Sequence, residues 1–102
     1  VRGGLKRGGG EAALALEELS QCVDGSGDVQ RELEATELAA RINDFVLALP
    51  QAERRGFLCR YWYLDSVAEI AIRFGFSTSK VKSMLYRIRQ QLRQTLEQEG
   101  LL

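Results

Sequence analysis

The chain has 102 residues, 45% of them hydrophobic, which suits one small domain with a modest core. It contains one proline, no histidine and two cysteines. The absence of histidine excludes His-dependent triads and His-containing zinc sites, and Cys22 and Cys59 form neither a disulfide framework nor a metal-ligand spacing. No apolar run is long enough for a membrane span. We expect an all-α protein of the reducing cytoplasm that is no enzyme and carries no cofactor.

Charge is distributed unevenly along the chain, although its formal net charge is zero. Residues 1–53 hold five basic and ten acidic side chains, a balance of minus five. Residues 54–102 hold nine basic and four acidic side chains, a balance of plus five. An acidic half is therefore joined to a basic half, and the basic half is suited to an anionic partner.

The first 28 residues have the composition of a linker. Residues 1–10 combine five glycines with three basic residues, so we expect them to be flexible. Residues 11–20 have the composition of a short helix, which stops before the turn-rich stretch at 24–28. The sequence starts at Val1 and not at methionine, so we expect a fragment whose natural N-terminal part is missing.

Residues 29–49 predict an amphipathic helix with five apolar side chains on one face: Leu38, Ile42, Phe45, Val46 and Leu49. Pro50 cannot continue this helix but suits the first turn of the next one, which should reach about residue 63. We expect the second helix to expose Glu53, Arg54, Arg55 and Arg60. Its buried side chains should be Phe57, Leu58, Tyr61 and Trp62, because aromatic residues at helical spacing in a small domain usually form core.

The stretch 67–92 predicts two helices that meet at Gly75. Ser66 and Glu69 have the spacing of a capping box, which starts the third helix at a defined residue. Gly75 suits the positive φ of a helix end, and Ser77 can cap the fourth helix. The third helix should bury Val67, Ile70, Ala71 and Phe74.

The fourth predicted helix runs from residue 77 or 78 to about residue 99 and spans roughly 30 Å. Gly100 should end it. Its inward stripe consists of Val81, Leu85, Ile88 and Leu92. Residues 29–102 therefore predict an all-α, four-helix domain with a C-terminal helix-turn-helix and no sheet.

Residues 49–99 contain five motifs: LP at 49–50, RYWYLDS at 60–66, AEIA at 68–71, GFS at 75–77 and VKSMLYRIRQQLR at 81–93. Through these motifs, residues 49–99 strongly resemble region 4 of sigma-70 family transcription initiation factors, with the closest likeness to the extracytoplasmic-function (ECF) group. The resemblance implies a winged-helix-like bundle that holds the minus-35 element of promoter DNA in the major groove. It also implies docking on the β flap of bacterial RNA polymerase. Residues 1–28 resemble the tether that joins region 2 to region 4.

The basic residues support the DNA-binding half of this expectation. Between Arg54 and Arg93 there are nine of them against Asp65 and Glu69 alone, a charge pattern that favours phosphate. Base contacts should come from the first turns of the fourth helix, namely from Ser79, Lys80, Lys82, Ser83 and Arg87. Phosphate contacts are expected from Ser77, Thr78, Arg60, Arg73 and Arg89, and Tyr86 also faces solvent or DNA. For any single Lys or Arg a solvated helix face is an equally good interpretation; the cluster favours DNA.

Two alternatives remain at this point. The chain can be the effector domain of a response regulator, a stand-alone helix-turn-helix transcriptional regulator. It can also be a protein-interaction module that an anti-sigma factor or another partner holds away from DNA. The RYWYLDS segment and the tether favour the DNA-binding domain of an alternative sigma factor over both.

Overall fold

The computed structural model describes residues 8–23 and 31–101, and each of its elements is helical. The elements are η1 (Gly8–Ala12), a short π-helical turn, followed by α2 (Ala13–Val23), α3 (Arg31–Ala48), α4 (Gln51–Tyr61), α5 (Val67–Phe74) and α6 (Thr78–Gln98). The predicted all-α fold is confirmed within these residues. The turn predicted at 24–28 and the flexibility predicted for residues 1–7 concern residues outside these ranges. Residues 8–10, which were also expected to be flexible, belong to η1.

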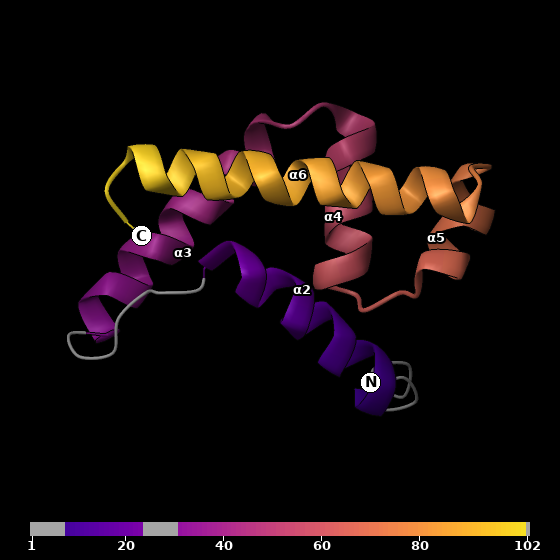
Figure 1. Ribbon diagram of the computed structural model, residues 1–102, viewed down its shortest axis with the longest axis horizontal. Helices are drawn as coiled ribbons and strands as arrows, with labels where there is room; N and C mark the ends of the chain where they lie inside the picture. The colour runs from indigo at the N-terminus through magenta and orange to yellow at the C-terminus, as the bar shows by residue number, and fades with distance from the viewer. Residues whose placement is uncertain (1–7, 24–30, 102) are drawn as a thin grey trace.

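The longest helix, α6, is the one on which the other helices pack (Figure 1). Helix α5 packs at its N-terminal end, α4 crosses its middle and α3 lies toward its C-terminal end. Helix α2 runs diagonally beside α6 and contacts both α4 and α6. Helix α2 is therefore packed against the unit formed by α3 to α6, although residues 24–50 separate it from α4 in sequence.

The core follows the inward face of α6. Val81, Leu85, Ile88 and Leu92 are each at most 1% exposed, so the predicted stripe is confirmed. Met84 and Leu96, which the prediction did not include, are buried on the same face. The partners come from three elements: Ile70 and Ala71 of α5, Phe57 of α4, and Val46 and Leu49 at the end of α3. Burial of this one stripe fixes the rotation of α6 about its own axis.

Short-range chemistry sets the bounds of α5 and α6 as predicted. The Ser66 hydroxyl accepts from the Glu69 N–H at 3.1 Å while the Glu69 carboxylate accepts from the Ser66 N–H at 2.9 Å. Gly75 has φ +73°, and the next N–H, that of Phe76, donates to the Ala71 carbonyl at 2.9 Å. These bonds satisfy backbone groups that helix ends otherwise leave unpaired. The turn between α5 and α6 is thereby fixed in shape.

The expected burial of Trp62 is wrong: its side chain is 74% exposed. Helix α4 ends at Tyr61, and the N–H groups of Trp62 and Tyr63 both donate to the Leu58 carbonyl. Trp62 still has helical backbone angles, but at about 100° per residue it lies on the side of α4 opposite the buried Phe57 and Arg60. Its side chain therefore points away from the core. Tyr63 is also exposed, at 63%, whereas Tyr61 is partly buried and packs on Phe57 with ring centroids 4.8 Å apart.

Candidate nucleic-acid interface

The outward surface of α6 carries most of the residues predicted to contact DNA. Consecutive helical residues are about 100° apart, so Ser79 and Ser83 lie opposite the buried stripe. Lys82, Tyr86 and Arg89 form one flank of this surface, and Lys80 and Arg87 form the other. Every one of these side chains is exposed except that of Arg89. The exposed set is available to a partner that approaches α6 from outside.

The first turn of α6 is fixed by a capping hydrogen bond and has a lysine ammonium beside it. The Ser77 hydroxyl accepts from the Lys80 N–H at 3.0 Å, and Ser77 and Thr78 are both exposed at the helix start. The Lys80 ammonium lies 4.1 Å from the centre of the Phe76 ring, which restricts the lysine side chain beside the turn. Exposed backbone N–H groups, hydroxyls and an ammonium at a helix N-terminus can together bind phosphate oxygens.

Arg73 is held at the turn between α4 and α5 by Asp65. Its guanidinium lies 3.0 Å from the buried Asp65 carboxylate, and the attraction of this carboxylate raises the pKa of Arg73. The Asp65 N–H donates to the Cys59 carbonyl at 2.8 Å. These bonds hold the neighbouring Leu64 at φ +61°, a strained conformation for a residue with a side chain. The Arg73 side chain remains 53% exposed, so it can still reach a phosphate.

The expectation that Arg60 is exposed is wrong, because the residue is 2% exposed. Its guanidinium donates to the Asp65 carbonyl at 2.9 Å, to the Glu11 carboxylate at 2.8 Å, and to both carboxylate oxygens of Glu18 at 3.2 and 3.1 Å. Burial alone lowers the pKa of Arg60, but these carboxylates outweigh it and the pKa is raised. In this structure Arg60 is bound by acidic groups of the N-terminal segment.

Arg89 belongs to the same cluster. It donates a 2.8 Å hydrogen bond to the Tyr61 hydroxyl, which donates in turn to the Glu18 carboxylate at 2.8 Å. The Arg89 guanidinium also lies 3.6 Å from Glu18, and its side chain is only 13% exposed. Burial alone raises the pKa of Glu18, yet the hydrogen bonds from Arg60 and Tyr61 leave it lowered. We refer to Glu11, Glu18, Arg60, Tyr61 and Arg89 as the tether cluster.

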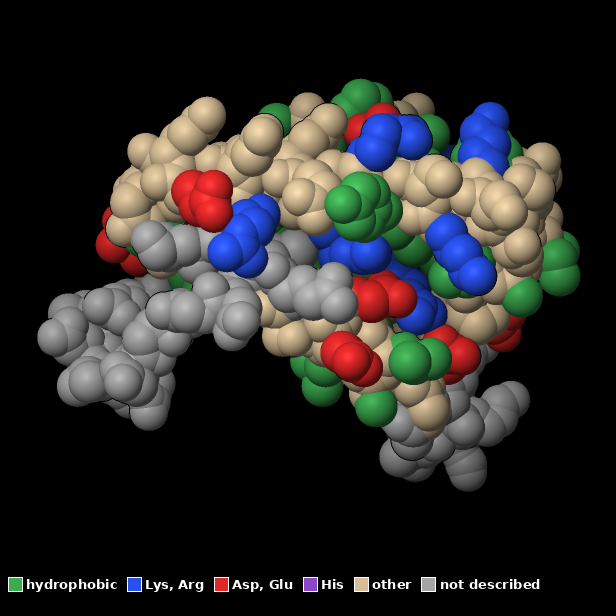
Figure 2. Space-filling view, in the orientation of Figure 1, with side chains coloured by type: hydrophobic (Ala, Val, Ile, Leu, Met, Phe, Trp, Pro, Cys, Tyr) green, Lys and Arg blue, Asp and Glu red, His purple; other side chains and the backbone are tan. Residues whose placement is uncertain are grey.

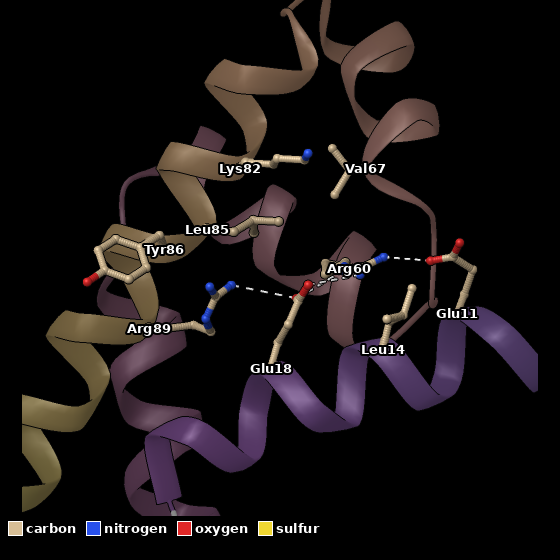
Figure 3. A pocket seen from close by; sticks show the side chains of 9 residues that line it. All are labelled: Glu11, Leu14, Glu18, Arg60, Val67, Lys82, Leu85, Tyr86 and Arg89. Carbon is tan, nitrogen blue, oxygen red and sulfur yellow. Dashed lines mark hydrogen bonds and ion pairs between the residues drawn. The ribbon is translucent and has the colours of Figure 1, made fainter.

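A cavity of about 490 Å³ lies between the N-terminal segment and one flank of α6, with Arg60 of α4 and Val67 of α5 also in its lining. Figure 3 shows Glu11, Leu14 and Glu18 projecting into it from the N-terminal segment, opposite Lys82, Tyr86 and Arg89 of α6. Figure 2 shows the same arrangement on the surface, with acidic side chains over α2 adjoining basic side chains over α4 and α6. Helix α2 thus lies beside one flank of the predicted recognition surface.

A family model described as "Sigma-70, region 4" matches residues 39–92, more than half of the chain. The chain belongs to the sigma-70 region 4 family. Region 4 is a DNA-binding domain of sigma factors that acts in promoter recognition and transcription initiation, so this region 4 domain has that role. No curated protein and no solved structure matches the chain. The match begins within α3, so η1 and α2 lie outside it.

Two acidic residues of the tether cluster in this region 4 domain were not predicted from the sequence: Glu11 and Glu18. They are seven residues apart and share a helical face with Ala15, which is 2% exposed. The spacing is visible in the sequence, but nothing local indicates that this face meets Arg60, which is 42 residues from Glu18. Over residues 8–23 and 31–101, no cluster of His, Cys, Asp or Glu could hold a metal ion. No helix within the same ranges has the length and apolar character of a membrane span.

Proposed function

We propose that this region 4 domain is the part of an ECF-type sigma factor that recognises the minus-35 element of a promoter. The observation that carries the proposal is the set of exposed polar and basic side chains on α6. The family match supports it, because the chain belongs to the sigma-70 region 4 family. Ser79, Lys80, Lys82, Ser83 and Arg87 offer hydroxyl, ammonium and guanidinium donors to base edges in the major groove. Ser77, Thr78 and Arg73 flank this surface and supply phosphate contacts.

The experiment that tests this proposal is a titration of the chain against labelled duplexes. One duplex carries a minus-35 element of the ECF type, and a second carries the same bases in scrambled order. We expect weak binding that falls steeply with added salt, because cation release from phosphates drives association. We also expect tighter binding to the first duplex. Equal affinity for both duplexes, or binding that does not change with salt, would contradict the major-groove assignment.

We further propose that a second surface docks on the β flap of bacterial RNA polymerase. The support is the end of α4, where Trp62 and Tyr63 are 74% and 63% exposed. Large exposed aromatic side chains are enriched in protein interfaces and depleted elsewhere on surfaces. An anti-sigma factor is a candidate competitor for the same domain. Co-purification of the chain with polymerase, lost when the flap is deleted, is the expected result; retention without the flap would exclude this docking site.

A further inference from the structure

Helix α2 docks on the domain through one continuous face. Glu11, Ala15, Glu18 and Leu19 recur at helical spacing and face α4 and α6. Two carboxylates meet two guanidiniums, Ala15 is buried where the helices approach closely, and Leu19 packs on the main core cluster. The contact therefore combines charge complementarity with apolar packing and is specific for this orientation of α2.

Helix α2 covers a basic surface of α4 and α6 to which DNA phosphates would bind. Glu18 engages Arg89 and Arg60, the two arginines of this flank that the sequence predicts as phosphate contacts. Lys82 and Tyr86, on the outward side of α6, line the cavity next to Glu11 and Leu14. Residues 8–23 contain three glutamates and no basic residue. A DNA backbone brought against this flank would be repelled by α2 and would find its cationic partners already engaged.

We propose that α2 is an intramolecular competitor of DNA: the tether cluster forms only when this flank of α6 is empty, and DNA binding displaces α2. The inference rests on the proposed function of α6 and adds its regulation. The family match does not include α2, so the competition is a property of this chain's own N-terminal segment. Because the Glu11 and Glu18 carboxylates carry negative charge, as phosphates do, displacement exchanges one set of ion pairs for another.

The strength of the competition follows from the fraction of molecules in which α2 is undocked. The apparent dissociation constant equals the intrinsic one divided by that fraction, so a helix docked nine times in ten weakens binding about tenfold. A segment of the sigma factor that pulls α2 away would increase the DNA affinity by the same factor. The tether thus couples the position of the N-terminal segment to promoter affinity.

The test compares two double variants of the full chain that carry the same net charge. Glu11→Gln/Glu18→Gln removes both carboxylates from the tether cluster while keeping side-chain size. Glu17→Gln/Glu37→Gln removes two exposed carboxylates, one of them also on α2. In fluorescence anisotropy with the minus-35 duplex at constant salt, we expect the first variant to bind about tenfold more tightly than the second. Equal affinities of the two variants would overturn the proposal, because net charge alone would then explain any change in DNA binding.

A second measurement needs no substitution. Hydrogen exchange of the wild-type chain should show that the amides of α2 lose protection when the duplex is added, while those of α5 and α6 gain it. Unchanged or increased protection of α2 in the complex would overturn the competition even if the variants differ in affinity. If wild type and both variants all fail to bind any duplex, the proposed function and this inference both fail. Equal binding by the three chains contradicts the inference alone.

Discussion

Arg89 of α6 donates a 2.8 Å hydrogen bond to the Tyr61 hydroxyl of α4, although 28 residues separate the two. The Tyr61 hydroxyl in turn donates a hydrogen bond to the Glu18 carboxylate, so this one side chain links α2, α4 and α6. Burial raises the pKa of Tyr61 well above its ordinary value of 10.0, which keeps the hydroxyl protonated as the donor to Glu18. This link is the most directly testable part of the packing around α2.

Replacing Tyr61 by Phe removes the hydroxyl and keeps the ring that packs on Phe57. Glu18 and Arg89 then contact each other directly through their 3.6 Å ion pair, and Glu18 keeps its hydrogen bonds from Arg60. We expect the free energy of unfolding to fall by about 1 kcal/mol, as for a typical lost hydrogen bond. Urea denaturation measures it. The exposed Tyr63→Phe serves as the control and should stay within about 0.5 kcal/mol of wild type. Equal effects of both changes would show that the hydroxyl link contributes nothing.

Acidification should release α2. The pKa of Glu18 in the docked state lies below its ordinary value of 4.5, so its contribution to docking is fully present above pH 4.5. That contribution is lost as the pH falls through the lowered pKa, because protonation removes the carboxylate that Arg60 and Arg89 bind. Hydrogen exchange of the α2 amides across this window measures the loss. In Glu18→Gln the loss of α2 protection at low pH should disappear. If the loss persists in this variant, a group other than Glu18 causes it.

The capping box at the start of α5 should be worth a measurable part of the stability. Ser66→Ala removes the acceptor of the Glu69 N–H, and we expect a loss of about 1 kcal/mol in the free energy of unfolding. Ser66→Thr keeps a hydroxyl at the same place and should recover most of it. Thermal or urea unfolding distinguishes the variants. A Thr variant as unstable as the Ala variant would contradict the capping explanation.

Single cation deletions on α6 should separate the two kinds of DNA contact. Lys82→Ala and Arg87→Ala should each weaken duplex binding, by about 1–3 kcal/mol if the side chain reads a base edge. If the side chain contacts phosphate instead, the slope of log affinity against log salt concentration should decrease in magnitude by about 1. Arg41→Ala is the matched control, since Arg41 lies on α3 and pairs with Asp44. A loss as large for Arg41 would mean that net charge alone drives binding.

The exposed tryptophan offers a test of polymerase docking that leaves DNA binding intact. Trp62→Ala removes an aromatic side chain that is 74% exposed, so the free energy of unfolding should change by less than about 0.5 kcal/mol. We expect co-purification with polymerase to decrease and duplex affinity to stay the same. Undiminished co-purification would remove Trp62 from the proposed docking surface.

Local sequence determined the helix-turn-helix because its signals act over a few residues. The capping box of Ser66 and Glu69, the positive φ of Gly75 and the four-residue stripe of α6 each involve neighbours within one or two helical turns. Such interactions depend little on the rest of the fold. The all-α fold and the exposed donors of α6 could therefore be predicted before any tertiary contact was known.

Only the tertiary structure decided that Arg60 is buried and Trp62 is exposed. Arg60 was expected at the surface, but Glu18 and Glu11, which are 42 and 49 residues away, bury it. Trp62 was expected in the core, but α4 packs through the face that carries Phe57 and Arg60, and Trp62 lies on the opposite side of the helix. Both outcomes depend on where distant segments meet, and periodicity within a single helix contains no information about such meetings. Only the folded chain shows that acidic α2 packs against the basic surface of α4 and α6. The proposed regulation of DNA binding follows from this contact.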